Sequence, residues 1–101
     1  MARRSGVPLR TQRIERLVFA DGSFLEGTIT QFAPSQPIGF DYRLVYLASD
    51  GTVLILYDNQ GGHAPHRHIK GTREPYRFVG IDQLVDDFLN DVEGIRREDE
   101  P

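Results

Sequence analysis

The chain has 101 residues, a formal net charge of −3 and no cysteine. This length predicts one domain with a single, modest hydrophobic core. The lack of cysteine excludes disulfides, thiolate metal sites and a cysteine nucleophile. No apolar run approaches the roughly 20 residues that a membrane helix needs, and no apolar signal-peptide core follows the basic N-terminus. We therefore expect a cytoplasmic protein without a membrane partner.

Charge is divided unevenly along the chain. Residues 1–77 hold ten Arg or Lys and seven Asp or Glu, whereas residues 78–101 hold two Arg and eight Asp or Glu. One interpretation is a solvated acidic helix face followed by a frayed end. The other is a basic body that meets a polyanion while the acidic tail stays away from it.

The N-terminal half predicts hairpins. We expect residues 1–10 to form a disordered basic arm and residues 13–20 to form a strand. Asp21-Gly22 predicts a two-residue type I′ turn, and residues 23–32 predict the return strand, with Leu25 and Ile29 on one face. Residues 33–39 form a loop on composition, because they hold two prolines and a glycine.

The middle of the chain predicts the centre of a sheet. Residues 40–49 alternate, so that Tyr42, Leu44 and Tyr46 point one way and the intervening residues the other. Asp50-Gly51 predicts a second two-residue turn. Residues 52–58 are apolar on both faces, which is typical of a central strand. Residues 75–79 are a further candidate for a short strand.

The C-terminal segment predicts an amphipathic helix. Its apolar residues recur at spacings of three and four: Ile81, Leu84, Val85, Phe88, Leu89, Val92 and Ile95. Gly80 is a tolerable N-cap. The expected fold is α+β, with a small antiparallel meander of about five to six strands and this helix packed on one face. The single domain spans residues 11–97, and residues 98–101 form an acidic tail.

All three histidines of the chain lie within residues 61–71, together with Arg67 and Lys70. If residues 66–70 are extended, then His66, His68 and Lys70 line one face, with the two imidazoles about 7 Å apart along the strand. Arg67 would point to the other face. This pattern favours metal-independent cleavage of RNA, with His66, His68 and Lys70 as the catalytic residues.

Two histidines suit this chemistry because imidazole exists in both protonation states near neutral pH. One can take the proton of the 2′-OH while the other protonates the 5′-oxygen, and a cation can stabilise the charge of the phosphorane. Stacking of a base on an aromatic ring would add affinity. The candidate substrate-binding residues are Arg67, Arg73, Arg43, Tyr57 and Tyr76.

Less specific interpretations of the same residues remain open. The histidines could belong to a polar loop, Arg73 could pair with Glu74 or with the acidic helix, and the tyrosines could be core residues. His63, His66 and His68 could also supply three imidazoles to zinc. The basic residues interleaved with them disfavour a cation, so we expect no metal and no other cofactor.

Several short motifs stand out in the second half of the chain: YDN (57–59), HRH (66–68), Glu74-Pro75-Tyr76 with Phe78, and Asp87-Phe88 with Asp91-Val92. Together they resemble those of the TumE-like toxins of bacterial and archaeal toxin–antitoxin pairs, over roughly residues 40–97. The family pattern usually reads G-x-x-x-HRH, often with an acidic residue before HRH; here Pro65 takes that place and His63 is an addition.

The resemblance implies a small growth-inhibiting toxin that is neutralised by a helix-turn-helix antitoxin similar to TumA. The first hypothesis is an endoribonuclease toxin acting on RNA, supported by analogy with other small toxins. The second is a non-enzymatic antitoxin-binding module whose Asp-rich helix docks a basic partner. A small cupin-like metalloprotein is the third. An edge strand at 13–20 could also pair two copies into a homodimer.

Overall fold

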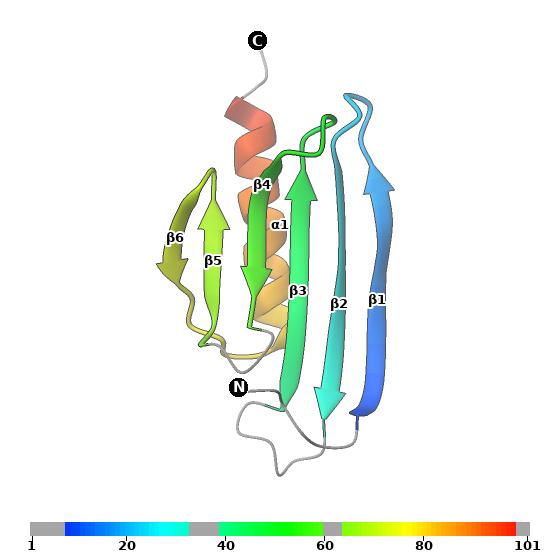
Figure 1. The fold of residues 1–101 in the computed structure, drawn as a ribbon, viewed down its shortest axis with the longest axis vertical. Coiled ribbons are helices and arrows are strands. Elements are labelled where there is room, and N and C mark those ends of the chain that lie inside the picture. The colour runs from blue at the N-terminus through cyan, green and yellow to red at the C-terminus, as the bar shows by residue number, and fades with distance from the viewer. Residues whose placement is uncertain (1–7, 33–38, 60–63, 99–101) are drawn as a thin grey trace.

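The computed structural model describes residues 8–32, 39–59 and 64–98. Six strands follow one another as neighbours in a single sheet in chain order, every pair is antiparallel, and one helix closes the chain (Figure 1). The predicted α+β meander with a C-terminal helix is therefore confirmed. The elements are β1 (Pro8–Val18), β2 (Phe24–Phe32), β3 (Phe40–Leu47), β4 (Val53–Asp58), β5 (His66–Ile69), β6 (Thr72–Pro75) and α1 (Ile81–Glu98).

Two strands differ most from their predicted bounds. β1 begins at Pro8, so residues 8–10 of the expected arm belong to the sheet. The last strand covers 72–75 rather than 75–79, because a turn at Lys70-Gly71 returns the chain earlier than we expected. The predicted tail 98–101 begins inside α1, because Glu98 is the last residue of the helix. The arm up to residue 7, most of the loop 33–39, His63 and residues 99–101 lie outside the described residues.

The two Asp-Gly turns occur where predicted, but they are longer than two residues. Gly22 donates to the carbonyl of Phe19, Gly51 donates to that of Ala48, and both glycines have positive φ (87° and 91°). Neither aspartate has positive φ, which a type I′ turn would require. The pattern is typical of a three-residue loop with glycine in the left-handed position. The prediction of two-residue turns was therefore wrong at both sites.

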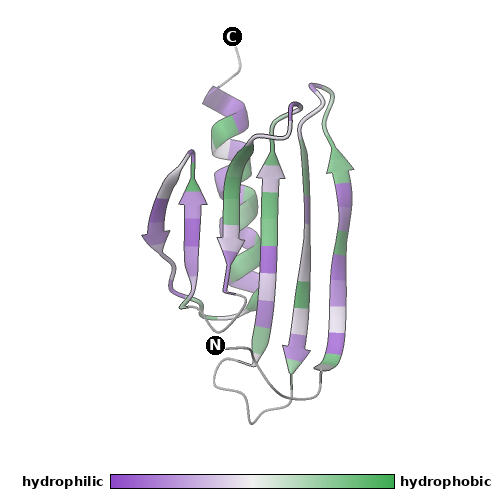
Figure 2. Ribbon diagram, in the orientation of Figure 1, coloured by the Kyte–Doolittle hydropathy of each residue, from purple (hydrophilic) through white to green (hydrophobic). Residues whose placement is uncertain are grey.

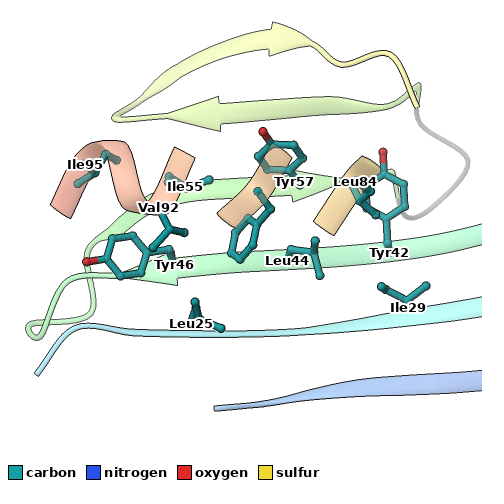
Figure 3. Packing of buried hydrophobic residues seen from close by; sticks show 11 residues of the cluster. Leu25, Ile29, Tyr42, Leu44, Tyr46, Ile55, Tyr57, Leu84, Val92 and Ile95 are labelled. Carbon is teal, nitrogen blue, oxygen red and sulfur yellow. The ribbon is translucent and has the colours of Figure 1, made fainter. Parts of the chain in front are cut away.

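The core lies between one face of the sheet and α1 (Figure 3). Alternate residues of β2, β3 and β4 point to the helix. The helix packs against them with the apolar stripe that its sequence predicted. Leu89, at 44% exposure, is the member of the stripe that stays in solvent. The buried cluster consists of Leu25, Ile29, Tyr42, Leu44, Tyr46, Ile55, Tyr57, Leu84, Phe88, Val92 and Ile95.

Helix α1 starts beside Gly80, whose carbonyl accepts the hydrogen bond of the Leu84 amide at 3.0 Å. The helix crosses behind β3 and β4, and leaves β1 and β2 to extend past it on one side (Figure 1). Among the described residues, no helix is long and apolar enough to cross a membrane. β4 lies between β3 and β5, as its apolar faces predicted, and β1 forms one edge of the sheet.

The sheet face opposite α1, hereafter the open face, is not covered by any other described element (Figure 1). The strand register places side chains on it in rows that cross the sheet. Hydrophilic residues predominate along β5 and β6, whereas β4 is mainly hydrophobic (Figure 2). One row reads Arg13, Thr28, Arg43, Asp58, His66, Pro75, and the next row reads Glu26, Val45, Leu56, His68, Arg73.

Candidate active site

The two histidines of β5 lie together on the open face. Their ring centroids are 5.3 Å apart and the rings meet edge to face, closer than the roughly 7 Å that the strand repeat alone sets. His66 is opposite Asp58 of β4, and His68 is opposite Leu56. Both residues are half-buried, so their imidazoles combine a fixed position with access to solvent.

The structure also indicates which nitrogen of His66 can act as a base. Its Nδ1 atom lies 3.2 Å from the carbonyl oxygen of Ala64. A carbonyl can only accept a hydrogen bond, so Nδ1 carries the proton in this contact. The neutral ring then has its lone pair on Nε2, because a neutral imidazole holds one proton.

Arg67, between the two histidines, points to the helix side. Its Nη1 atom lies 3.0 Å from the hydroxyl of Tyr57 and 3.2 Å from Oδ2 of Asp91, and Nη2 lies 3.3 Å from Oε2 of Glu74. The hydrogen bond with Tyr57 and the two carboxylates raise the pKa of Arg67 above its ordinary value. Arg67 thus ties β5 to α1, and its guanidinium is turned away from the histidines rather than toward a substrate on their face.

The two candidate stacking tyrosines also belong to the helix side. Tyr57 is fully buried and donates a hydrogen bond to Asp91, so a base cannot reach its ring. Tyr76 packs edge to face on Tyr57 at 4.9 Å and donates to Oδ2 of Asp87 at 2.5 Å. Burial is the main cause that raises the pKa of both hydroxyls, and the hydrogen bonds to the aspartates add to it.

Lys70 does not share the face of the histidines. Lys70 and Gly71 have φ angles of 50° and 85° and connect Ile69 to its cross-strand partner Thr72. Positive φ at both central positions is the requirement of a two-residue type I′ turn. The extended run therefore ends at Ile69, and the Lys70 ammonium contacts the carboxylate of Glu98 at the end of α1.

Two of the predicted arginines do lie on the open face. Arg73 of β6 is exposed and is the cross-strand partner of His68. Arg43 of β3, with a side chain 48% exposed, places Nη1 3.4 Å from Oδ2 of Asp58, the residue opposite His66. The pairing of Arg73 with Glu74 that we considered is not seen, because Glu74 contacts Arg67.

Asn59 has a role that we did not predict. It is fully buried, its Oδ1 accepts from the amide of Tyr42 at 2.8 Å, and its Nδ2 donates to the carbonyl of Phe40 at 3.0 Å. The side chain thus holds β3 just beyond the last residue of β4. An asparagine directly after an apolar strand was the available signal, but it is also a common turn residue.

The aspartates of the helix divide between two environments. Asp87 and Asp91 are half-buried and bind Tyr76 and Tyr57, whereas Asp82 and Asp86 are exposed. Phe78 stacks on Tyr42 with ring centroids 5.4 Å apart. Most residues that carry the sequence resemblance therefore hold the sheet to the helix. Those that lie on the open face are the two histidines, Asp58 and Pro75.

The three-histidine metal hypothesis includes a residue outside the described part of the chain, His63. Among the residues that the structure does describe, no group of three or more His, Cys, Asp or Glu is placed to hold a metal ion. His66 and His68 share the open face with the cationic side chains of Arg73 and Arg43 and with the carboxylate of Asp58.

Comparison with known proteins identifies a family for the chain. No curated protein and no solved structure matches the chain. The family model described as Toxin TumE matches residues 4–96, which is nearly the whole chain. The match includes the strand with the two histidines and most of the helix that Arg67 holds. The chain therefore belongs to the Toxin TumE family, as a toxin component of a toxin–antitoxin pair.

Proposed function

We propose that this toxin is a metal-independent endoribonuclease whose acid–base pair is His66 and His68. The observation that carries the proposal is their juxtaposition: two rings 5.3 Å apart on the open face, with Arg73 opposite His68. Arg67 supports it indirectly, because its bonds to the helix side fix the strand that presents both rings.

The reaction is an internal transfer at phosphorus. Nε2 of His66 takes the proton of the ribose 2′-OH as the 2′-oxygen attacks the phosphorus. The bond from phosphorus to the 5′-oxygen breaks, and His68 in its protonated form gives that oxygen a proton. The products are a 2′,3′-cyclic phosphate and a free 5′-OH, with one proton gained by His66 and one lost by His68. Solvent exchange then restores both rings.

Arg73 is the group that we assign to the developing charge on the phosphorane. It lies beside His68, whereas the ammonium of Lys70 contacts Glu98. A guanidinium can bind two phosphate oxygens through its fork of donors. Membership of the toxin family supports an antitoxin partner, and we propose a helix-turn-helix protein in the cytoplasm for that role.

The test is cleavage of single-stranded RNA by purified protein in excess EDTA, with the ends identified by mass spectrometry. We expect 2′,3′-cyclic phosphate and 5′-OH ends. His66→Ala and His68→Ala should each abolish cleavage while circular dichroism stays native. The pH profile of wild type should be bell-shaped, because one ring must be neutral and the other protonated.

Arg77→Ala is the matched control, because Arg77 is exposed and lies outside the sheet. It should cleave like wild type. Retained cleavage in either histidine variant, or cleavage that requires added zinc, would remove the proposal. Growth arrest that persists in both histidine variants would favour a non-enzymatic binding module in its place.

A further inference from the structure

The open face carries a hollow of about 300 Å³ over β1, β2 and β3, away from the histidines. Its lining includes Arg13, Thr28 and Arg43, which are cross-strand neighbours in one row. We propose that these three side chains form a phosphate-binding subsite for a single-stranded RNA that extends from His66 across the sheet. The inference rests on the proposed function and adds a place where the substrate is held at a distance from the cleaved bond.

The sheet register connects this subsite to the active site. The row that starts at Arg13 continues through Asp58 to His66. Neighbouring strands are about 4.8 Å apart, so Arg43 stands roughly 10 Å and Arg13 roughly 19 Å from His66 at the level of the backbone. Surfaces that bind single strands combine cationic side chains in a track along the nucleic-acid backbone. An RNA that crosses the strands would pass both arginines in turn.

Both guanidiniums are accessible to a phosphate. Arg13 is exposed, and the described part of the chain gives its side chain no ion pair or hydrogen bond. Arg43 contacts Asp58 through Nη1 alone, at 3.4 Å. A guanidinium has five N–H donors, so this contact uses a small part of its capacity. The hydroxyl of Thr28, between the two arginines, can donate a further hydrogen bond.

The charged side chains that line the hollow are three arginines and two glutamates, a formal balance of +1, and Asp58, outside the lining, contacts Arg43 from one side. Arg16 is held by Glu26, with Nε 2.9 Å from Oε1, and stacks on the ring of Phe24 at 4.3 Å. This pair cancels its own charge and fixes one wall. Glu15 is the remaining carboxylate of the lining. It opposes two guanidiniums, so it weakens phosphate binding without abolishing it, and Glu15→Gln should tighten binding.

The experiment measures the Kd of a fluorescein-labelled 2′-O-methyl oligoribonucleotide by anisotropy. This probe has no 2′-OH nucleophile and cannot be cleaved. Arg13→Gln and Arg43→Gln should each weaken binding by about tenfold, the usual cost of a lost charged hydrogen bond. Each should also lower the slope of log Kd against log salt by about 0.7.

Arg10→Gln is the control, because Arg10 is exposed on the same strand but three residues from Arg13, which places it on the opposite face. It should bind like wild type. If the double variant Arg13→Gln/Arg43→Gln binds as Arg10→Gln does, or if wild type binds no probe, the subsite is overturned.

Cleavage of an unmodified RNA by the same proteins separates this inference from the proposed function. If wild type binds through both arginines but never cleaves, the subsite proposal is supported and the nuclease proposal is contradicted. If wild type cleaves and the double variant binds and cleaves equally well, the nuclease proposal is supported and the subsite proposal is contradicted.

Discussion

The Nη1 atom of Arg67 lies 3.2 Å from Oδ2 of Asp91, so the residue between the two histidines joins their strand to the helix. Because successive side chains of a strand point to opposite faces, the HRH motif presents two imidazoles to solvent and one guanidinium to the core side. The histidines are thus the proposed catalytic residues on one face of the strand, and Arg67 anchors the strand to the helix on the other.

Loss of Arg67 should destabilise the fold. Arg67→Ala removes hydrogen bonds to Tyr57, Asp91 and Glu74 and leaves Asp91 with less compensation for its charge. A buried bond to a charged group contributes about 1.5–3 kcal/mol, but these bonds are partly exposed and share one guanidinium, so we expect the free energy of unfolding in urea to fall by about 2–3 kcal/mol in all. Arg73→Ala, on the exposed side of the next strand, should change it by less than about 0.5 kcal/mol. Equal losses in the two variants would contradict the anchoring role.

Asn59 should be as important for stability as a large core residue. Asn59→Ala leaves the amide of Tyr42 and the carbonyl of Phe40 without their side-chain partner. Unsatisfied buried polar groups cost about 1–3 kcal/mol each, so a loss of about 2–4 kcal/mol is expected in chemical denaturation. Asn90→Ala, exposed on the helix, serves for comparison and should be neutral or slightly stabilising. A neutral Asn59→Ala would show that backbone or water replaces its bonds.

Two glycines should respond in opposite directions to alanine. A Cβ at Gly27 would meet Cδ2 of Leu44 at 2.6 Å and the carbonyl oxygen of Arg43 at 2.7 Å, so Gly27→Ala should cost about 1–3 kcal/mol. A Cβ at Gly94 meets nothing within 4 Å, and the residue is exposed in α1. Gly94→Ala should stabilise by about 0.5–1 kcal/mol through helix propensity. Thermal unfolding of both variants decides the point.

The hydroxyl of Tyr42 is buried and has no hydrogen-bond partner within the described residues. Tyr42→Phe removes this unsatisfied group and keeps the ring that stacks on Phe78. The free energy of unfolding of Tyr42→Phe at pH 7 should therefore equal or exceed that of wild type. Tyr57→Phe, by contrast, loses a bond to Asp91 and should be less stable. A marked loss of stability in Tyr42→Phe would mean that its hydroxyl has a partner outside this part of the chain.

The same tyrosine predicts a dependence on alkaline pH. Burial, and then the charge of Asp58, raise the pKa of Tyr42 above its ordinary value. A raised pKa in the folded state contributes stability that is complete below about pH 10, the pKa of unfolded tyrosine, and is lost as pH rises further. One tyrosine can change the free energy of unfolding by up to about 1.4 kcal/mol per pH unit. Between pH 10 and 11, the free energy of unfolding of Tyr42→Phe should therefore fall less steeply than that of wild type.

The alternation of β2 and β3 and the spacing of α1 were sufficient to predict the fold. Tyr42, Leu44 and Tyr46 share the buried face because a period of two allows no other arrangement. The pairing of His66 with His68 followed from the same rule. These features depend on the spacing of residues that are close together in the chain, and this spacing can be read from a single sequence.

Lys70 and Tyr57 show what local pattern does not contain. Lys70 turns away from His68 because Lys70-Gly71 forms a tight turn, and lysine is an uncommon residue at positive φ. Tyr57 is buried in the core against α1, where Asp91, 34 positions later, accepts its hydrogen bond. Partners that far apart come together only through the packing of α1 on the sheet.

Since α1 covers a single side of the sheet, the proposed function assigns folding and chemistry to nearly separate sets of residues. Surviving colonies selected from cells that overproduce this protein should therefore carry two kinds of lesion. One kind, in the helix or the residues beneath it, removes the polypeptide through misfolding and proteolysis. The other, on the uncovered side, leaves an abundant, well-folded but harmless polypeptide.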